Sequence, residues 1–82
     1  MSRDEILKRI QQIIRDVFDD EQLEILETTN ANDMEGWDSF MHITILEAIQ
    51  EEFKVKFSLD DIIEMQDVKK IIDAIVQSGT NR

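Results

Sequence analysis

The sequence predicts an all-α protein, a small four-helix bundle with three longer helices and one short helix. Apolar residues recur at steps of three and four wherever a period is clear, which is the spacing of one helix face. The chain has no proline, and its only glycines are Gly36 and Gly79, so few residues interrupt a helix. Its 82 residues suffice for one small core, and we expect residues 1–82 to form a single domain.

The first predicted helix begins at Ser2 and ends near Asp19 or Asp20. Ser2 and Glu5 have the spacing of a capping box, in which each side chain bonds to a backbone N–H of the first turn. The stripe that follows is strongly amphipathic and is assigned to the core: Ile6, Leu7, Ile10, Ile13, Ile14, Val17 and Phe18.

The apolar pattern dissolves between residues 21 and 37, and residues 28–33 are rich in turn-forming side chains. We expect Leu23, Ile25 and Leu26 to hold the first part of this connection on the bundle. A connection of this length is unusual in a compact domain, so it either carries function or contains a short helical turn.

The second predicted helix starts at Asp38 or Ser39 and runs to about Phe53. Because successive helical residues are about 100° apart, five apolar residues share a predicted core face: Ile43, Ile45, Leu46, Ile49 and Phe53. His42 falls on this face, so we expect a mostly neutral, partly buried packing residue. The opposite, solvent-facing side carries Phe40, Met41, Thr44, Glu47, Ala48 and Glu51. Exposed apolar residues among acids indicate a docking surface.

Two more helices complete the prediction. A short helix is expected over residues 59–64, where Ser58 and Asp61 resemble a second capping box. The last helix is capped by Asp67, and Gly79 is expected just past its end. Its inward face is predicted to be Val68, Ile71, Ile72, Ile75 and Val76.

The composition argues against several classes of protein. A net charge of −10 repels nucleic-acid phosphates and suits docking to basic patches on proteins, so we expect no DNA or RNA partner. The absence of cysteine and the single histidine argue against a metal site, and an EF-hand centred on Gly36 would put Ala31 and His42 at obligatory ligand positions. With no signal-peptide pattern and no apolar run of membrane-spanning length, we expect a cytoplasmic protein. We also expect it to be a monomer.

Three roles are open to Ser39, which lies where loop becomes helix in "EGWDSFMHITILEAIQEEF". As a helix cap it would accept a backbone N–H, but Asp38 alone can fill that role and leave Ser39 free. As a nucleophile it would need a base, and His42 is poorly aimed because side chains on one helix lean toward its N-terminus. We therefore expect no catalytic residue and no enzyme activity. The third role is a site to which another enzyme attaches a group.

The segment "GWDSFMHITILEAIQEEF" resembles the Asp-Ser-Leu segment of acyl carrier proteins. The resemblance continues without a gap through "VKFSLDDIIEMQDVKKIIDAI", so it covers roughly residues 35–76. The first helix and the connection after it match in length and period only. The resemblance implies an acyl-carrier-protein-like bundle in which the second helix recognises partner enzymes.

For the cofactor, the resemblance implies that Ser39 carries 4′-phosphopantetheine, with Asp38 beside it in the same site. A phosphopantetheinyl transferase would move the group from coenzyme A with Mg²⁺. Acyl cargo would then form a thioester with the thiol of the arm, and a chain without cysteine needs such an imported thiol.

For partners, the resemblance implies acyl-activating and acyl-transferring enzymes with basic docking patches, in a fatty-acid, polyketide or other specialised pathway. The implied partner-facing residues are Asp38, Phe40, Met41, Thr44, Glu47, Ala48 and Glu51. Phe40 replaces the usual leucine, and His42 after "WDS" is similar to carriers of specialised pathways.

Two other functions remain open. A carrier of aminoacyl groups, such as D-alanine, would share the fold and the arm and differ only in cargo and activating enzyme. An unmodified helical adaptor would bind a basic partner through the face that carries Phe40 and Met41, and it would tolerate Ser39→Ala. For any acyl carrier, marginal stability and an aliphatic core would suit a bundle that opens to shelter an acyl chain.

Overall fold

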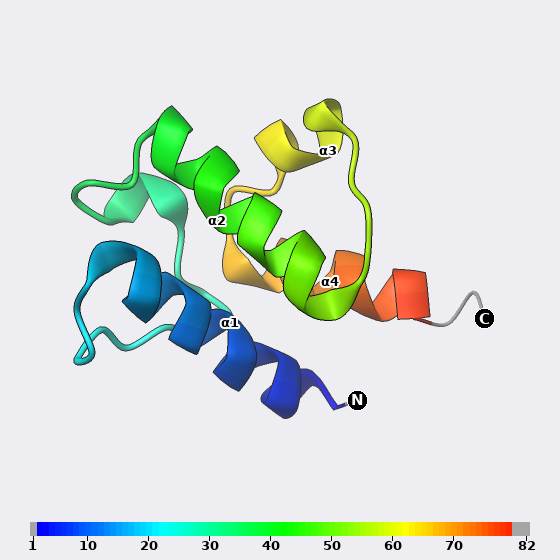
Figure 1. The fold of residues 1–82 in the computed structure, drawn as a ribbon, viewed down its shortest axis with the longest axis horizontal. Helices are drawn as coiled ribbons and strands as arrows, with labels where there is room; N and C mark the ends of the chain where they lie inside the picture. The colour runs from blue at the N-terminus through cyan, green and yellow to red at the C-terminus, as the bar shows by residue number, and fades with distance from the viewer. Residues whose placement is uncertain (1, 80–82) are drawn as a thin grey trace.

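The computed structural model describes residues 2–79 and confirms the all-helical prediction. Its elements follow one another in the order α1 (Arg3–Phe18), η1 (Ala31–Asp33), α2 (Ser39–Phe53), α3 (Leu59–Glu64) and α4 (Val68–Gly79). Figure 1 shows α2 between α1 and α3, with α4 behind them, and α2 contacts both α1 and α3. Because helices pack on both sides of α2, its first turn is held in a fixed position relative to the rest of the bundle.

Helix α1 begins with the predicted capping box. The Ser2 hydroxyl accepts the Glu5 N–H at 3.2 Å, and the Glu5 carboxylate accepts the Ser2 N–H at 3.3 Å. This bonding lowers the pKa of the Glu5 carboxyl group. The helix ends at Asp19, whose φ of 54° places it in the left-handed region that stops a helix.

The core is built almost entirely from aliphatic side chains of all four helices. Nine of these side chains are essentially inaccessible to water: Ile6, Ile10, Ile14, Ile45, Leu46, Ile49, Val68, Ile71 and Ile72. Branched aliphatic side chains have few rotamers and no polar atoms, so they pack densely without needing buried hydrogen bonds. The predicted inward face of α4 is confirmed, except that Val76 is only half-buried.

The long connection between α1 and α2 is tied to the bundle and contains the helical turn η1. Its backbone bonds to the start of α4, since Val68 N–H donates to the Thr29 carbonyl at 3.0 Å and Ala31 N–H donates to the Gln66 carbonyl at 2.7 Å. Ile25 is buried as predicted, but Leu26 is 53% exposed, so its predicted role as an anchor is wrong.

The cap of α4 forms as predicted, but only one half of the predicted capping box forms at α3, because within residues 2–79 the Asp61 side chain does not return a bond to the Ser58 N–H. The Ser58 hydroxyl accepts the Asp61 N–H at 3.1 Å, and the Asp67 carboxylate accepts the Lys70 N–H at 2.8 Å. One boundary differs, because α4 includes Gly79 rather than ending before it.

Arg3 joins the start of α1 to the connection and to α4. Its guanidinium donates to Glu27 Oε1 and to Asp73 Oδ1, each at 2.7 Å. These hydrogen bonds lower the pKa of the Glu27 and Asp73 carboxyl groups below their ordinary values. The side chains remain partly exposed, so solvent screens their attraction.

We expect the stability contributed by Arg3 to disappear in acid. A carboxyl group whose pKa is lower in the folded state stabilises the fold above its unfolded pKa, and that contribution is lost as pH falls through the folded pKa. Urea unfolding should therefore show Arg3→Gln to be less stable than wild type near neutral pH, and the difference should narrow as pH falls through the lowered pKa values of Glu27 and Asp73. Arg9→Gln removes a single contact, to Glu52 at 3.2 Å, and should show a smaller difference. An Arg3→Gln difference that persists in acid would refute this linkage.

Candidate functional site

Ser39 is the first residue of α2, and its side chain is exposed. Within residues 2–79 its hydroxyl makes no hydrogen bond. The capping role belongs to Asp38, whose Oδ1 accepts the Met41 N–H at 2.8 Å. The Asp38 side chain thus fixes the helix start, and the hydroxyl of Ser39 is left accessible beside the positive end of the helix dipole.

The turn that leads into α2 depends on Gly36 and Trp37. Gly36 has a φ of 88°, which a side chain would strain, and a Cβ there would contact the Phe18 ring at 3.5 Å. Trp37 is buried, and its ring centroid lies 6.0 Å from that of Phe18. The contact between the two rings thus packs Trp37, two positions before Ser39, against the end of α1.

His42 is buried, with 7% of its surface exposed, and both of its ring nitrogens have partners. Trp37 Nε1–H donates to Nδ1 at 3.0 Å, and Nε2 lies 2.7 Å from the carbonyl oxygen of Ile62 in α3. An indole only donates and a carbonyl only accepts, so these bonds select the neutral imidazole protonated on Nε2. His42 is therefore the packing residue that the sequence predicts, and it makes no hydrogen bond to Ser39.

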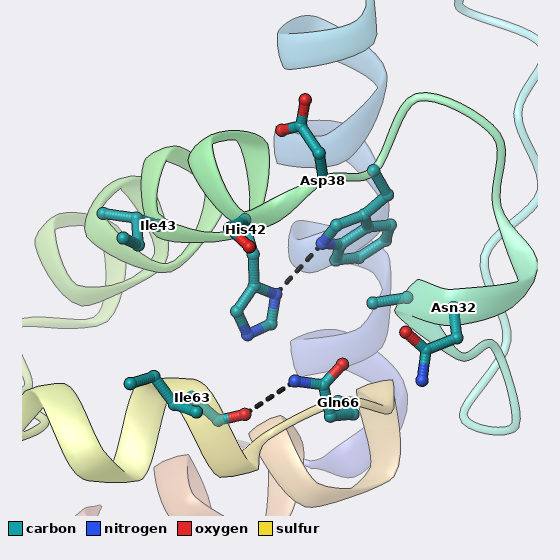
Figure 2. Close-up of a pocket in the computed structure, with 9 residues that line it drawn as sticks. Asn32, Asp38, His42, Ile43, Ile63 and Gln66 are labelled. Atoms are coloured by element: carbon teal, nitrogen blue, oxygen red, sulfur yellow. Dashed lines mark hydrogen bonds between the residues drawn. The ribbon is translucent and has the colours of Figure 1, made fainter.

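A cavity of about 330 Å³ lies beside Ser39, between η1, the start of α2 and the end of α3. Figure 2 shows His42 projecting from α2 toward α3, with Asn32 and Gln66 on the other side of the space. The lining is mixed in polarity: Ala31, Asn32, Trp37, Asp38, Ser39, His42, Ile43, Ile63 and Gln66. The site thus combines an accessible hydroxyl with a small adjoining pocket.

The structure corrects the predicted faces of α2 at two positions. Ile43, assigned to the core, is 38% exposed and lines the cavity, while Met41, assigned to solvent, is half-buried against the core. The reason is that α2 packs against both α1 and α3, and the cavity lies between α2 and the end of α3.

Several lining residues were not predicted. Ile63 is 55% exposed beside the buried Ile62, and the apolar pattern of this short helix does not decide which of the two isoleucines faces the core. Asn32 and Gln66 carry no signal in the sequence, since their places in the cavity follow from how η1 and the α3–α4 link fold onto α2.

The outer side of α2 carries the residues predicted to face partners. Phe40 is 79% exposed, and Glu47 and Glu51 are also exposed. Met41, Thr44 and Ala48 are half-buried, so they offer less surface than the sequence suggests. Within residues 2–79, no helix has the length and apolarity needed to cross a bilayer.

Together, these contacts define a small helical bundle with an accessible serine hydroxyl at a capped helix start. Comparison with known proteins identifies the family of this chain. The family model described as "Phosphopantetheine attachment site" matches residues 8–75. An acyl carrier protein of Cyanidium caldarium is 24% identical over 82 residues, covering 100% of this chain and 95% of the relative.

A solution structure of holo acyl carrier protein from Geobacter metallireducens has the same fold. It superimposes with a TM-score of 0.80 at 28% identity, covering 92% of this chain and 86% of the other. The chain therefore belongs to the phosphopantetheine attachment-site family, as an acyl carrier protein. Its cofactor is covalent 4′-phosphopantetheine, and it is a carrier rather than an enzyme.

The residues present fit this cofactor. The attached group needs a serine hydroxyl that a second active site can reach, and Ser39 supplies one at an exposed helix start. The phosphodiester formed there is an anion, which the N-terminal end of α2 favours electrostatically. The pocket beside Ser39 leaves room for part of an arm that folds back on the protein.

Proposed function

We propose that Ser39 is the residue that carries phosphopantetheine, and that the chain delivers acyl groups bound to this arm. The observation that supports this most is the division of roles at the start of α2. Asp38 caps the helix, so the neighbouring hydroxyl is accessible and unbonded within residues 2–79. Ser58 lies at a similar helix start, but its hydroxyl is occupied as a cap.

The proposed modification is a phosphoryl transfer catalysed by a phosphopantetheinyl transferase with Mg²⁺. Ser39 Oγ attacks the pantetheine-side phosphorus of the coenzyme A pyrophosphate, and a new P–O bond forms. The bridging P–O bond breaks, 3′-phosphoadenosine 5′-phosphate leaves, and the serine proton passes to a base of the transferase. The product is a phosphodiester whose arm ends in a thiol able to form thioesters.

The proposed partners are that transferase and the acyl-activating and acyl-transferring enzymes of one pathway, in the cytoplasm. Fatty-acid, polyketide and other specialised pathways are all compatible with the arm, as is aminoacyl transfer. Enzymes with basic patches would dock on α2, where Glu47 and Glu51 are exposed on the same side of the helix as Phe40 and the chain as a whole carries a charge of −10.

We expect intact-mass measurement to show the gain of one phosphopantetheinyl group when the protein is incubated with coenzyme A, Mg²⁺ and a broad-specificity transferase. Ser39→Ala should abolish the gain completely. Ser58→Ala is the matched control, because it removes the hydroxyl of another serine beside a helix start and should leave the gain intact. Failure of several transferases to modify the wild type would favour the unmodified adaptor instead.

A further inference from the structure

Resting on the proposed attachment at Ser39, we propose that His42 closes the passage between α2 and α3, so that this carrier serves short, polar acyl groups rather than long aliphatic chains. The inference starts from the position of the imidazole. It forms part of the wall of the cavity beside Ser39 and spans the gap between the two helices (Figure 2). An arm that folds back from Ser39 meets this ring before it meets the core.

The ring is held in place from both sides. The bond from Trp37 Nε1–H and the contact to the Ile62 carbonyl connect the loop before α2, α2 itself and α3. Moving the ring would leave the indole N–H of the buried Trp37 without its partner, which is unfavourable. The Ile62 carbonyl would keep only a 3.3 Å bond from Met65 N–H.

Beyond the ring there is packed core. Ile45, Leu46 and Ile49 follow along α2 with no exposed surface, and the cavity lining includes none of them. A long aliphatic chain would therefore have to break the His42 bonds and also separate close-packed side chains. Without both changes, a long acyl chain stays outside the helical bundle, and its apolar surface remains in contact with water.

The cavity itself suits a different cargo. Its volume of about 330 Å³ is near the lower end of the roughly 300–1,000 Å³ found for small-molecule sites. The Asn32 side-chain amide makes no hydrogen bond within residues 2–79, and the Gln66 amide donates to the Ile63 carbonyl at 2.6 Å, which leaves its oxygen as an acceptor. Ile43 and Ile63 add short apolar walls. A small acyl group with a hydroxyl or amino substituent matches this mixture.

The test uses protein loaded with butyryl, 3-hydroxybutyryl or dodecanoyl groups from the corresponding acyl-coenzyme A by a broad-specificity transferase. Intact mass confirms each loading, and the rate of hydroxylamine cleavage reports exposure of the thioester. Wild-type dodecanoyl thioester should react as fast as free dodecanoyl-pantetheine. The side-chain amide signals of Asn32 and Gln66 in NMR spectra should shift with 3-hydroxybutyryl cargo and remain unchanged with dodecanoyl.

Removing the ring should open the passage. An acyl thioester that is sheltered nine-tenths of the time is cleaved by hydroxylamine about tenfold more slowly. We expect a slowing of this order for the dodecanoyl thioester of His42→Ala. His42→Gln is the conservative control, since its amide can still donate to the Ile62 carbonyl and should keep the chain exposed. If His42→Ala fails to fold, Trp37→Phe removes the indole donor while keeping an aromatic ring at this position, and it should slow cleavage in the same direction.

The outcomes separate the two proposals. If no acyl group loads, attachment at Ser39 fails and this inference fails with it. If loading succeeds but wild type protects the dodecanoyl thioester as well as His42→Ala does, His42 does not exclude long chains, while the carrier function stands. If the Asn32 and Gln66 signals do not shift with the 3-hydroxybutyryl group, the cavity does not bind short polar cargo and that part of the inference fails, while the carrier function again stands.

Discussion

Replacing Ile45 with alanine should lower the free energy of unfolding by about 2–5 kcal/mol, a large part of what so small a bundle has. Ile45 has no exposed surface and lies in α2, the helix that contacts both α1 and α3. Truncation removes buried apolar surface and leaves a cavity that rigid neighbours fill only in part. Urea denaturation monitored by circular dichroism measures the change.

Ile43 provides a matched control for this truncation, because it is the same residue type in the same helix. It is 38% exposed and lines the cavity beside Ser39, so Ile43→Ala should cost about 1 kcal/mol or less. Equal losses for the two variants would mean that α2 buries both side chains, as the helical wheel predicts, and would contradict the arrangement described here.

Reversing the charges of Glu47 and Glu51 together should slow modification of Ser39 by about tenfold at low salt. Both side chains are exposed on the outer side of α2, where a basic partner would approach. Electrostatic steering acts mainly on the association rate and is screened by salt, so the deficit should shrink as ionic strength rises. The effect is measured as the rate at which the carrier gains the mass of the phosphopantetheinyl group, at two salt concentrations and with the carrier at a concentration that does not saturate the transferase.

The control for this reversal is Glu21→Lys with Glu24→Lys, in the connection between α1 and η1. Either pair of replacements changes the net charge from −10 to −6, because each exchange adds two units. Only the α2 pair should slow modification strongly. Equal slowing by the two pairs would show that total charge matters and that α2 is not the docking face.

The local features of the fold could be predicted because they depend on residues close in sequence. Caps at Ser2, Asp38, Ser58 and Asp67 act over three residues, and each side chain accepts the backbone N–H three residues further on. The accessible serine at the start of α2 follows from the same logic, since Asp38 fills the capping position and the next side chain is left unbonded within residues 2–79.

The pocket could not be predicted, because its walls come from distant parts of the chain. Asn32 lies in η1, Ile43 in α2 and Gln66 after α3, and no periodicity relates them. The two wrong assignments on α2 have the same origin. A helical wheel assumes one core direction, whereas α2 packs against α1 on one side and α3 on another.

The sequence by itself determined an acidic helical bundle, its helix caps and an accessible Ser39, because helix periodicity and capping are short-range properties of the chain. It also placed His42 inside the bundle. Only the tertiary structure decided what His42 does there. Its partners are Trp37, five residues away, and Ile62, twenty residues away in another helix. Those bonds form only once α3 has packed against α2, so no local pattern in the sequence could specify them.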